Sequence, residues 1–442
     1  MPTLARPTPK VHSAHRPHPW AVLEHRDFRL FWLGQAVSGV GTFMQVVGQS
    51  LLVLQLSHNS ALALGLVSLA QALAFFAFAL IGGSVVDRVN RRKLLFVTQS
   101  LLLGLALTLA LLSAMGAATL PLVVVLAFCS GVVVSFDQPA RASLFPGLVP
   151  RAEMPKATAL NALAMTTAGT FGPALAGFTA ATLGLSVNFG LNALSFGIAL
   201  VCLALMRPVA LPQVVPARQP LIGSVREGLR VVARDPALQW VVSGYGVLLL
   251  LGPSPSVLLP LYAAQVLHVG GAQLGGLFLM VGAGTLLASA VQAAYGDGSS
   301  REGVFVVSLL VWASALAVFA LSASWVLSAA ALLVHGAARN VVGMTAVTLM
   351  QLRAPEHARG RVMSLNTLLS GGLRPLGDFC LSAFMAVTSL EGTTLVCAGL
   401  VGLYALILRR PLSSTHQNQE YAKESFKGSE QRAESKAVSG LS

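Results

Sequence analysis

The stretch "GGSVVDRVNRRK", residues 82–93, indicates the fold because it is a cluster of charged residues in a chain that carries little charge elsewhere. One acid and four bases lie between Asp87 and Lys93, whereas only 10% of the 442 residues are charged and 55% are hydrophobic. Soluble domains contain about 25% charged residues. A charged run between two long apolar stretches is typical of a short loop that joins two transmembrane helices.

Apolar runs of transmembrane length recur along the rest of the chain. A helix needs about 20 residues to cross a bilayer core roughly 30 Å thick, and the runs do not alternate with period two, which excludes a β-barrel. We therefore predict an all-α integral membrane protein with twelve spans in two six-helix halves. The expected spans are 30–56, 62–86, 94–115, 119–140, 157–182, 184–206, 238–267, 271–295, 302–322, 324–350, 361–388 and 391–409.

The distribution of basic residues predicts the orientation in the membrane. Of the 29 Lys and Arg residues, 27 lie in the two tails or in loops that follow even-numbered spans, and the other two, Arg339 and Arg374, lie inside expected spans. Because Lys and Arg are retained in cytoplasmic loops, both termini are expected to be cytoplasmic, in a bacterial inner membrane. The net charge of +13 then reflects topology and not nucleic-acid binding.

A polar linker divides the spans into two groups of six. Its sequence "LIGSVREGLRVVARDP" places Arg226, Arg230 and Arg234 on one helical face, which predicts an amphipathic helix on the lipid surface; a solvated linker helix is the alternative. The expected parts of the chain are a tail at 1–29, a bundle at 30–206, the linker at 207–237, a bundle at 238–409 and a disordered tail at 410–442.

An internal repeat supports this division. Residues 143–161 align without a gap to residues 348–366, and the pair Leu-Asn that ends the first segment also ends the second. The two segments occupy equivalent places in the two groups of spans. Parallel repeats of this kind are typical of transporters with a binding site near the middle of the membrane.

The loop at 82–93 resembles the loop between helices two and three of the major facilitator superfamily. The matching residues are Gly83, Asp87, Arg88, Arg91 and Arg92, and Asn90 stands where a second glycine is usual. The resemblance implies a conformational latch, in which the acid pairs across the two halves when the carrier opens outward. Asp137 and Arg141, at the end of the fourth span, are expected to join this latch. Alternatively, the cations serve only the positive-inside rule.

Longer stretches narrow the resemblance to the macrolide-efflux and enterobactin-exporter branch of that superfamily. They are "HRDFRLFWLGQAVSGVGTFMQ", "FDQPARASLFPGLVPRAEMPKATALN", "REGLRVVARDPALQW" and "RGRVMSLNTLLSGGLRPLG". The resemblance covers residues 25–408 and implies export of small molecules.

Two spans contain helix-disturbing residues. In the fifth span, "AGTFGPALAG" resembles the antiporter signature at Gly172, Pro173 and Gly177, with Ala176 in place of a glycine, which predicts a bend; a packing seam is the alternative. In the seventh span, "GPSPSVLLP" contains three prolines, which predicts a kink or a partly unwound segment beside a cavity.

Four ionisable residues lie within the expected spans, although each costs about 2.5–3.5 kcal/mol to insert if charged. His335 and Arg339 are one turn apart on the tenth span, and Arg374 and Asp378 are one turn apart on the eleventh. We interpret Asp378 as a proton-coupling acid that exchanges a proton with the external side, with Arg374 or Arg339 holding its charge and with Arg374 and His335 tuning its proton affinity. A static buried ion-pair cluster is the alternative.

Polar residues in three spans are candidates for the substrate cavity, and each has helix packing as its alternative interpretation. They are Gln45 and Gln49 in the first span, Asn161 and Thr167 in the fifth, and Tyr245 in the seventh. A mostly apolar cavity with few polar points suits a bulky amphipathic substrate better than a sugar.

The absence of several motifs argues against other functions. No phosphate-binding loop, zinc spacing or nucleophile elbow occurs, so we expect neither an enzyme nor a cofactor. The four cysteines lie in expected spans, and no metal site is expected. His12, His15 and His18 lie in the N-terminal tail, which is expected to be disordered; loose metal binding by these histidines is the alternative.

The sequence thus predicts a monomeric secondary transporter, embedded in the lipid bilayer, that exports small amphipathic drug-like, macrolide or siderophore-like molecules in exchange for protons. The rival interpretations are an uptake carrier or lipid flippase on the same fold, and a membrane receptor or scaffold that transports nothing.

Overall fold

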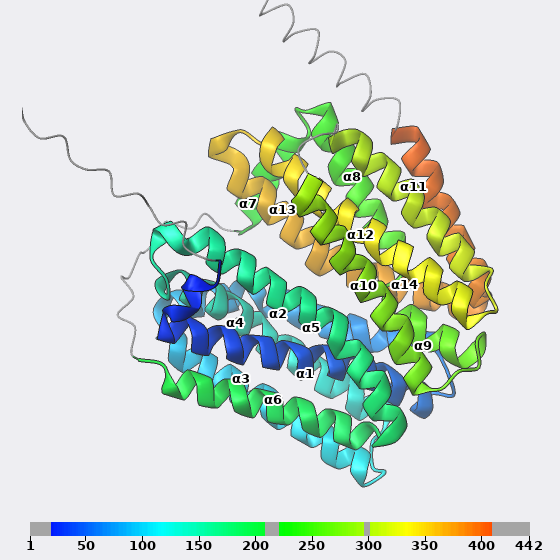
Figure 1. Cartoon of the computed structure of the whole chain (residues 1–442), viewed down its shortest axis with the longest axis horizontal. Helices are drawn as coiled ribbons and strands as arrows, with labels where there is room; N and C mark the ends of the chain where they lie inside the picture. Colours follow the sequence, from blue (N-terminus) through cyan, green and yellow to red (C-terminus); the bar gives the residue numbers. More distant parts are fainter. Residues whose placement is uncertain (1–18, 208–220, 296–300, 409–442) are drawn as a thin grey trace, which may run out of the picture.

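The computed structural model describes residues 19–207, 221–295 and 301–408. The expected tail up to residue 18, with its three histidines, the start of the linker at 208–220 and the tail from 409 lie outside the described residues. The described chain folds into two bundles of six membrane spans each, as predicted (Figure 1). Within these described ranges, ten helical segments are long and apolar enough to cross a membrane. The other two spans are the fifth, rich in Ala, Thr and Gly, and the eleventh, which is interrupted.

The N-terminal bundle follows the predicted spans, with ends shifted by at most a few residues. A 3-10 turn, η1 (Pro19–Glu24), precedes it, and the turns η2 (Phe145–Gly147) and η3 (Arg151–Glu153) join its fourth and fifth helices. Its helices are α1 (Arg26–Leu56), α2 (Ala61–Arg88), α3 (Arg91–Ala114), α4 (Leu120–Leu144), α5 (Met154–Thr182) and α6 (Leu185–Leu205).

The C-terminal bundle contains two spans that are not single helices. The linker helix is α7 (Leu221–Val232). The seventh span consists of α8 (Pro236–Leu251) and α9 (Pro255–Gln265). The eleventh consists of α13 (Arg359–Leu368), a π-helix (Leu369–Leu373) and α14 (Arg374–Val387). The other four spans are single helices: α10 (Gly271–Tyr295), α11 (Arg301–Ala320), α12 (Trp325–Arg353) and the last helix Leu390–Leu408. A short turn, η4 (Glu356–Ala358), precedes α13.

The predicted break in the seventh span is confirmed. Helix α8 ends at Leu251 and α9 begins at Pro255, so residues 252–254 interrupt the helix. Two of the five residues at 251–255 are prolines, which lack an N–H group and cannot continue the helical hydrogen-bond ladder. The π-helix in the eleventh span was not predicted; it contains Gly371 and Gly372, whose positions face Phe76 of α2.

Side-chain caps explain where α3 and α8 begin. Asn90, the departure from the family's glycine, caps α3, because its side chain accepts hydrogen bonds from the N–H groups of Arg92 (3.0 Å) and Lys93 (3.2 Å). Asp235 caps α8 in the same way. Such caps satisfy backbone donors that the first helical turn leaves unpaired.

The linker helix α7 packs on α13. Arg361 of α13 forms an ion pair with Glu227, and a Cβ atom at Gly228 would lie 2.6 Å from the carbonyl oxygen of Arg361. Val232 is buried, whereas Leu229 is half exposed. Helix α7 is therefore attached to the first turn of the eleventh span.

The two bundles meet mainly through α5 with α10 and through α2 with α14. We call the end of the molecule where α1 begins the terminal side, and the end where α1 finishes the far side. The contact between α5 and α10 pairs the last turns of α5 with the first turns of α10, which places it on the far side. In Figure 1 the bundles converge near α9 and diverge toward α7.

Glycines allow this far-side contact. A Cβ atom at Gly177 would lie 2.5 Å from both the carbonyl oxygen of Gly271 and the nitrogen of Gly275, so the two backbones touch only because no side chain intervenes. Gly172 has a similar role against Val40 and Phe43 of α1. Helix α5 continues through Pro173 without interruption. The antiporter-like stretch therefore supplies close packing at two interfaces, and its effect on a bend remains a prediction.

The Gly177 contact can be tested with an alanine pair. Gly177→Ala is expected to lower the free energy of unfolding by about 1–3 kcal/mol, because its methyl group overpacks the seam with α10. Gly190→Ala in α6 is the matched control, since no atom lies within 4 Å of a Cβ there. Melting curves of the purified variants in detergent would measure the difference, and equal melting temperatures would contradict the proposed packing.

Candidate functional site

A cavity of about 750 Å³ lies inside the N-terminal bundle. All six helices of that bundle contribute side chains, and α9 adds Ser256 and Val257. Along α1 the lining extends from Phe31 to Val53, which at 1.5 Å per residue is roughly 33 Å, close to the thickness of the bilayer core. Its volume falls within the range that accommodates drug-sized ligands.

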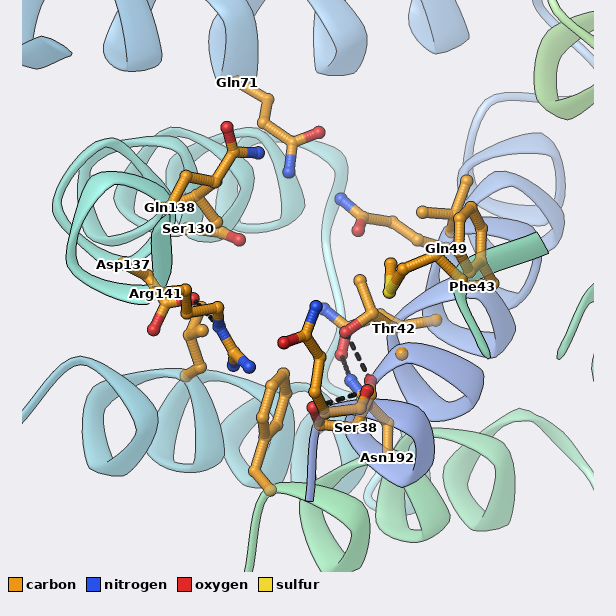
Figure 2. A pocket seen from close by; sticks show the side chains of 18 of the residues that line it. Ser38, Thr42, Phe43, Gln49, Gln71, Ser130, Asp137, Gln138, Arg141 and Asn192 are labelled. Carbon is orange, nitrogen blue, oxygen red and sulfur yellow. Dashed lines mark hydrogen bonds and ion pairs between the residues drawn. The ribbon is translucent and has the colours of Figure 1, made fainter. Parts of the chain in front are cut away.

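Amide side chains make up about half of the polar lining of the cavity. They come from five helices and are Gln35, Gln45, Gln49, Gln71, Gln138, Asn161 and Asn192. Figure 2 shows Gln49 on α1, Gln71 on α2 and Gln138 on α4 around the open space. The cavity is thus richer in hydrogen-bonding groups than the few polar points that we expected.

The predicted cavity residues divide into two groups. Gln45, Gln49 and Asn161 line the cavity, whereas Thr167 and Tyr245 do not belong to its lining. Tyr245 packs against the core of the C-terminal bundle. The side-chain oxygen of Asn161 is buried without a hydrogen-bond partner among the described residues, so it is available to a ligand or to water.

The sequence analysis missed most of a polar stripe on α1. Its members, Gln35, Ser38, Thr42, Gln45 and Gln49, all line the cavity and follow one another at spacings of three and four residues. That spacing places them on one face of a helix. The stripe was therefore readable from the sequence, although only its last two members were chosen. Asn192 of α6 donates a hydrogen bond to Gln45 and orients it.

Asp137 and Arg141 of α4 also line the cavity. The Asp137 carboxylate is buried and accepts hydrogen bonds from Thr98 (2.7 Å), Gln99 (2.7 Å) and the Nε atom of Arg141 (2.6 Å). Both residues were assigned to the latch from the sequence. The structure places them beside the cavity, and Figure 2 shows Arg141 at its edge.

The latch loop is described only in part. Both Gly83 and Asp87 lie in the last turns of α2, and the surroundings of Gly83 and the side chain of Asp87 lie outside what the structure describes. Arg88 is exposed, and Arg92 donates hydrogen bonds to the carbonyl oxygens of Leu203 (3.1 Å) and Ala204 (3.0 Å). Arg92 thus pairs with unsatisfied carbonyl groups at the end of α6, which is a stabilising position for a cation.

The four intramembrane ionisable residues lie in the C-terminal bundle, away from the cavity lining. Arg374 and Arg339 are both close enough to Asp378 to interact with it electrostatically. His335 is buried and packs its ring on Trp312, with a centroid distance of 5.2 Å. The structure therefore brings together three members of the predicted set and gives the fourth an aromatic partner.

Asp378 contacts the break in the seventh span. Its Oδ1 atom accepts a hydrogen bond from the backbone N–H of Ser254 (2.9 Å), the residue that precedes α9. A Cβ atom at Gly377 would touch the carbonyl oxygen of Leu250, so α14 packs directly on the end of α8. The Ser254 hydroxyl in turn hydrogen-bonds to that of Ser256 (3.1 Å), which lines the cavity. A continuous polar path thus joins Asp378 to the cavity.

Two bundles of six spans, one of which holds a cavity of this size, form the fold of a transporter of the major facilitator class. Solved structures share the fold: a bacterial homologue of the iron transporter ferroportin in the inward-facing state has a TM-score of 0.64 at 17% identity, covering 87% of this chain and 98% of that one. A bacterial homologue of the human lysosomal transporter Spinster, inward-facing and occupied, has a TM-score of 0.65 at 14% identity, covering 89% and 97%.

The family model described as transmembrane secretion effector matches residues 17–441, so the chain belongs to that family. Its relatives include the enterobactin exporter EntS of Citrobacter koseri, 24% identical over 383 residues that cover 85% of this chain and 91% of that protein. EntS of Escherichia coli is also 24% identical, over 397 residues that cover 88% and 94%. The predicted superfamily and branch are thereby confirmed.

The contact at the helix break predicts different outcomes for two substitutions of Asp378. Asp378→Leu leaves the Ser254 N–H without an acceptor and is expected to cost about 1–3 kcal/mol of unfolding free energy. Asp378→Asn keeps an acceptor oxygen and is expected to melt close to the wild type. Thermal melts in detergent provide the measurement; a leucine variant as stable as the asparagine variant would show that the hydrogen bond is dispensable.

Proposed function

We propose that this transporter exports small amphipathic molecules from the cytoplasm by alternating access, with the cavity of the N-terminal bundle as the substrate site. The observation that carries the proposal is the length of this cavity, whose lining follows α1 from Phe31 to Val53. A site of that length lets a molecule move through most of the bilayer thickness inside the protein. Membership of a secretion family supports export as the direction.

The positive-inside rule supports a cytoplasmic terminal side. In that orientation the close contact of Gly177 with α10 lies at the external side and separates the cavity from the outside. The conformation then corresponds to an inward-facing carrier in an inner membrane, ready to load from the cytoplasm. Outward opening requires this contact to separate, while the terminal ends of the bundles approach each other. We propose that the carrier does this as a monomer.

The lining suggests the kind of substrate. Seven amide side chains and several aromatic rings line one cavity, so both hydrogen-bonding groups and apolar surface of a ligand would be matched. Siderophore-like and macrolide-like molecules combine these properties. The enterobactin exporters among the relatives support a siderophore-like substrate. Because they are 24% identical to this chain, they support a class of substrate and not a particular compound.

We further propose that protons drive export through Asp378. A charged carboxylate accepts a stronger hydrogen bond than a neutral carboxyl group does. Protonation of Asp378 would therefore loosen its contact with Ser254 and free α9, whose residues Ser256 and Val257 line the cavity. Arg374 and Arg339 would stabilise the charged form. His335, packed on Trp312, would act on the set through its neighbour Arg339.

Export and its energy source can be tested together. Pump-deficient bacterial cells that express this protein are expected to accumulate less of at least one member of a panel of dyes, macrolides and a catecholate siderophore, and a protonophore should abolish the difference. Gln49→Trp, which fills the cavity, should abolish export, whereas Gln351→Trp at an exposed site of α12 should not. Asp378→Asn should be inserted normally but lose proton dependence.

Three results would contradict parts of this proposal. Unchanged accumulation across the panel would argue against export and favour an uptake carrier, a flippase or a receptor. Export that survives the protonophore would exclude a proton gradient as its energy source. Full proton-dependent export by Asp378→Asn would leave Asp378 with the static role at the helix break.

The latch is a separate prediction. If Asp87 pairs across the bundles in the outward-open state, a pair made in one state only shifts the equilibrium between states. Asp87→Asn is then expected to lose most transport while its amount in the membrane stays normal, measured by the same accumulation assay and by immunoblotting. Transport at the wild-type level by this variant would contradict the latch role of Asp87 and leave the loop with only a role in membrane orientation.

A further inference from the structure

Arg141 is the cation of the cavity. Among the lining residues that the structure describes, Asp137 and Arg141 alone are charged. The guanidinium group of Arg141 donates from its Nε atom to Asp137, and its side chain is 19% exposed. A guanidinium group carries five N–H donors in a planar fork, so four N–H groups remain on its two terminal nitrogens.

Asp137 is committed to holding Arg141 and does not itself offer a binding group. One of its oxygens accepts from both Thr98 and Gln99, and the other accepts from Arg141. Because two further donors share its charge, the carboxylate neutralises Arg141 less completely than a bare ion pair would. The pairing also fixes the guanidinium orientation, which lowers the entropic cost of binding a ligand.

Aromatic surface lies next to this cation. Phe145 follows Arg141 by four residues along the chain, and its ring packs edge-on against Phe28 (6.0 Å between centroids) and tilted against Phe31 (6.3 Å). Phe31 and Phe145 line the cavity together with Arg141. The terminal end of the cavity therefore combines a fixed cation with aromatic rings, and Gln138 and Thr158 add hydrogen-bonding groups.

We propose that Arg141 binds an anionic group of the substrate, and that the transporter selects amphipathic molecules bearing a carboxylate or acidic phenol beside an aromatic ring. This inference rests on the proposed function, since it specifies the substrate of the same cavity. The terminal guanidinium nitrogens bind the anion while Asp137 positions the group from the other side. Molecules whose only charge is positive gain nothing from Arg141 and are bound less well.

A pair of dyes tests the proposal directly. Rhodamine 110 carries a free carboxylate, and rhodamine 123 is its methyl ester, so the two probes differ at the anionic group. Fluorescence anisotropy with the purified protein in detergent is expected to show about tenfold tighter binding of rhodamine 110, the size of one charge-assisted hydrogen bond. Arg141→Gln should abolish this preference, and rhodamine 123, which gains nothing from Arg141, should still bind.

Two further variants separate recognition from folding. Arg141→Gln alone leaves the buried Asp137 carboxylate without its cation, so the double variant Asp137→Asn/Arg141→Gln removes both charges and keeps hydrogen-bonding side chains; it should also show no preference between the dyes. Arg359→Gln, at an exposed arginine of α13 outside the cavity lining, should keep the wild-type preference.

The outcomes distinguish this inference from the proposed function. Equal binding of the two dyes by the wild type, or a preference that survives in both Arg141 variants, would overturn the role of Arg141 and leave export untouched. Failure of the wild type to bind either dye would count against an amphipathic aromatic substrate altogether. Loss of rhodamine 123 binding in both Arg141 variants would show a structural role for Arg141 and would overturn the selection of anions.

Discussion

The hydrogen bond from the Ser254 backbone N–H to the Asp378 carboxylate allows the seventh span to break inside the membrane. An unpaired backbone group in the hydrocarbon costs several kcal/mol, so an interrupted span needs partners from a neighbouring helix. Asp378 supplies one, and Gly377 lets α14 approach the end of α8 closely enough to do so. The position of α9, and with it the C-terminal bundle's share of the cavity wall, depends on this contact.

The two bundles carry different polar groups. Amides and hydroxyl groups line the cavity of the N-terminal bundle, where Asp137 and Arg141 form an ion pair. The C-terminal bundle instead buries His335 and Asp378, and two partly buried arginines, Arg339 and Arg374, interact electrostatically with Asp378. Ser254 contacts Asp378, and its hydroxyl group hydrogen-bonds to that of Ser256, which lines the cavity. These two serines therefore connect the ionisable residues of the C-terminal bundle to the cavity. In the proposed mechanism, contacts with a substrate and changes of charge therefore occur in separate bundles, which are connected at Ser254 and Ser256.

Much of the fold was predictable because the bilayer imposes long apolar helices. The twelve spans and the proline-rich break at 252–254 followed directly from residue type. The π-helix at Leu369–Leu373 did not, because two adjacent glycines are compatible with several helical geometries and contact with Phe76 of α2 accompanies the observed one. The docking of α7 on α13 was equally hidden, since Glu227 and Arg361 are far apart in sequence.

The site was harder to predict than the fold. Gln45, Gln49 and Asn161 were identified as polar residues in apolar spans, but the same argument selected Thr167 and Tyr245, because polarity does not tell which way a helix face points. Asp137 and Arg141 were expected to join the latch, and that role stays a prediction. Their place in the cavity lining could not be read from the sequence, because no local motif connects α4 to Thr98 and Gln99 of α3, which hold Asp137.

The polar stripe on α1 has a kinetic consequence. From Gln35 to Gln49 it offers a hydrogen-bonding side chain every three or four residues over roughly 21 Å. A ligand that moves along this row exchanges each contact for a similar one, so its free energy changes little with depth and no single position becomes a deep trap. Such a flat profile favours modest affinity and rapid release, so turnover would be limited by the rearrangement of the bundles and not by the escape of the cargo.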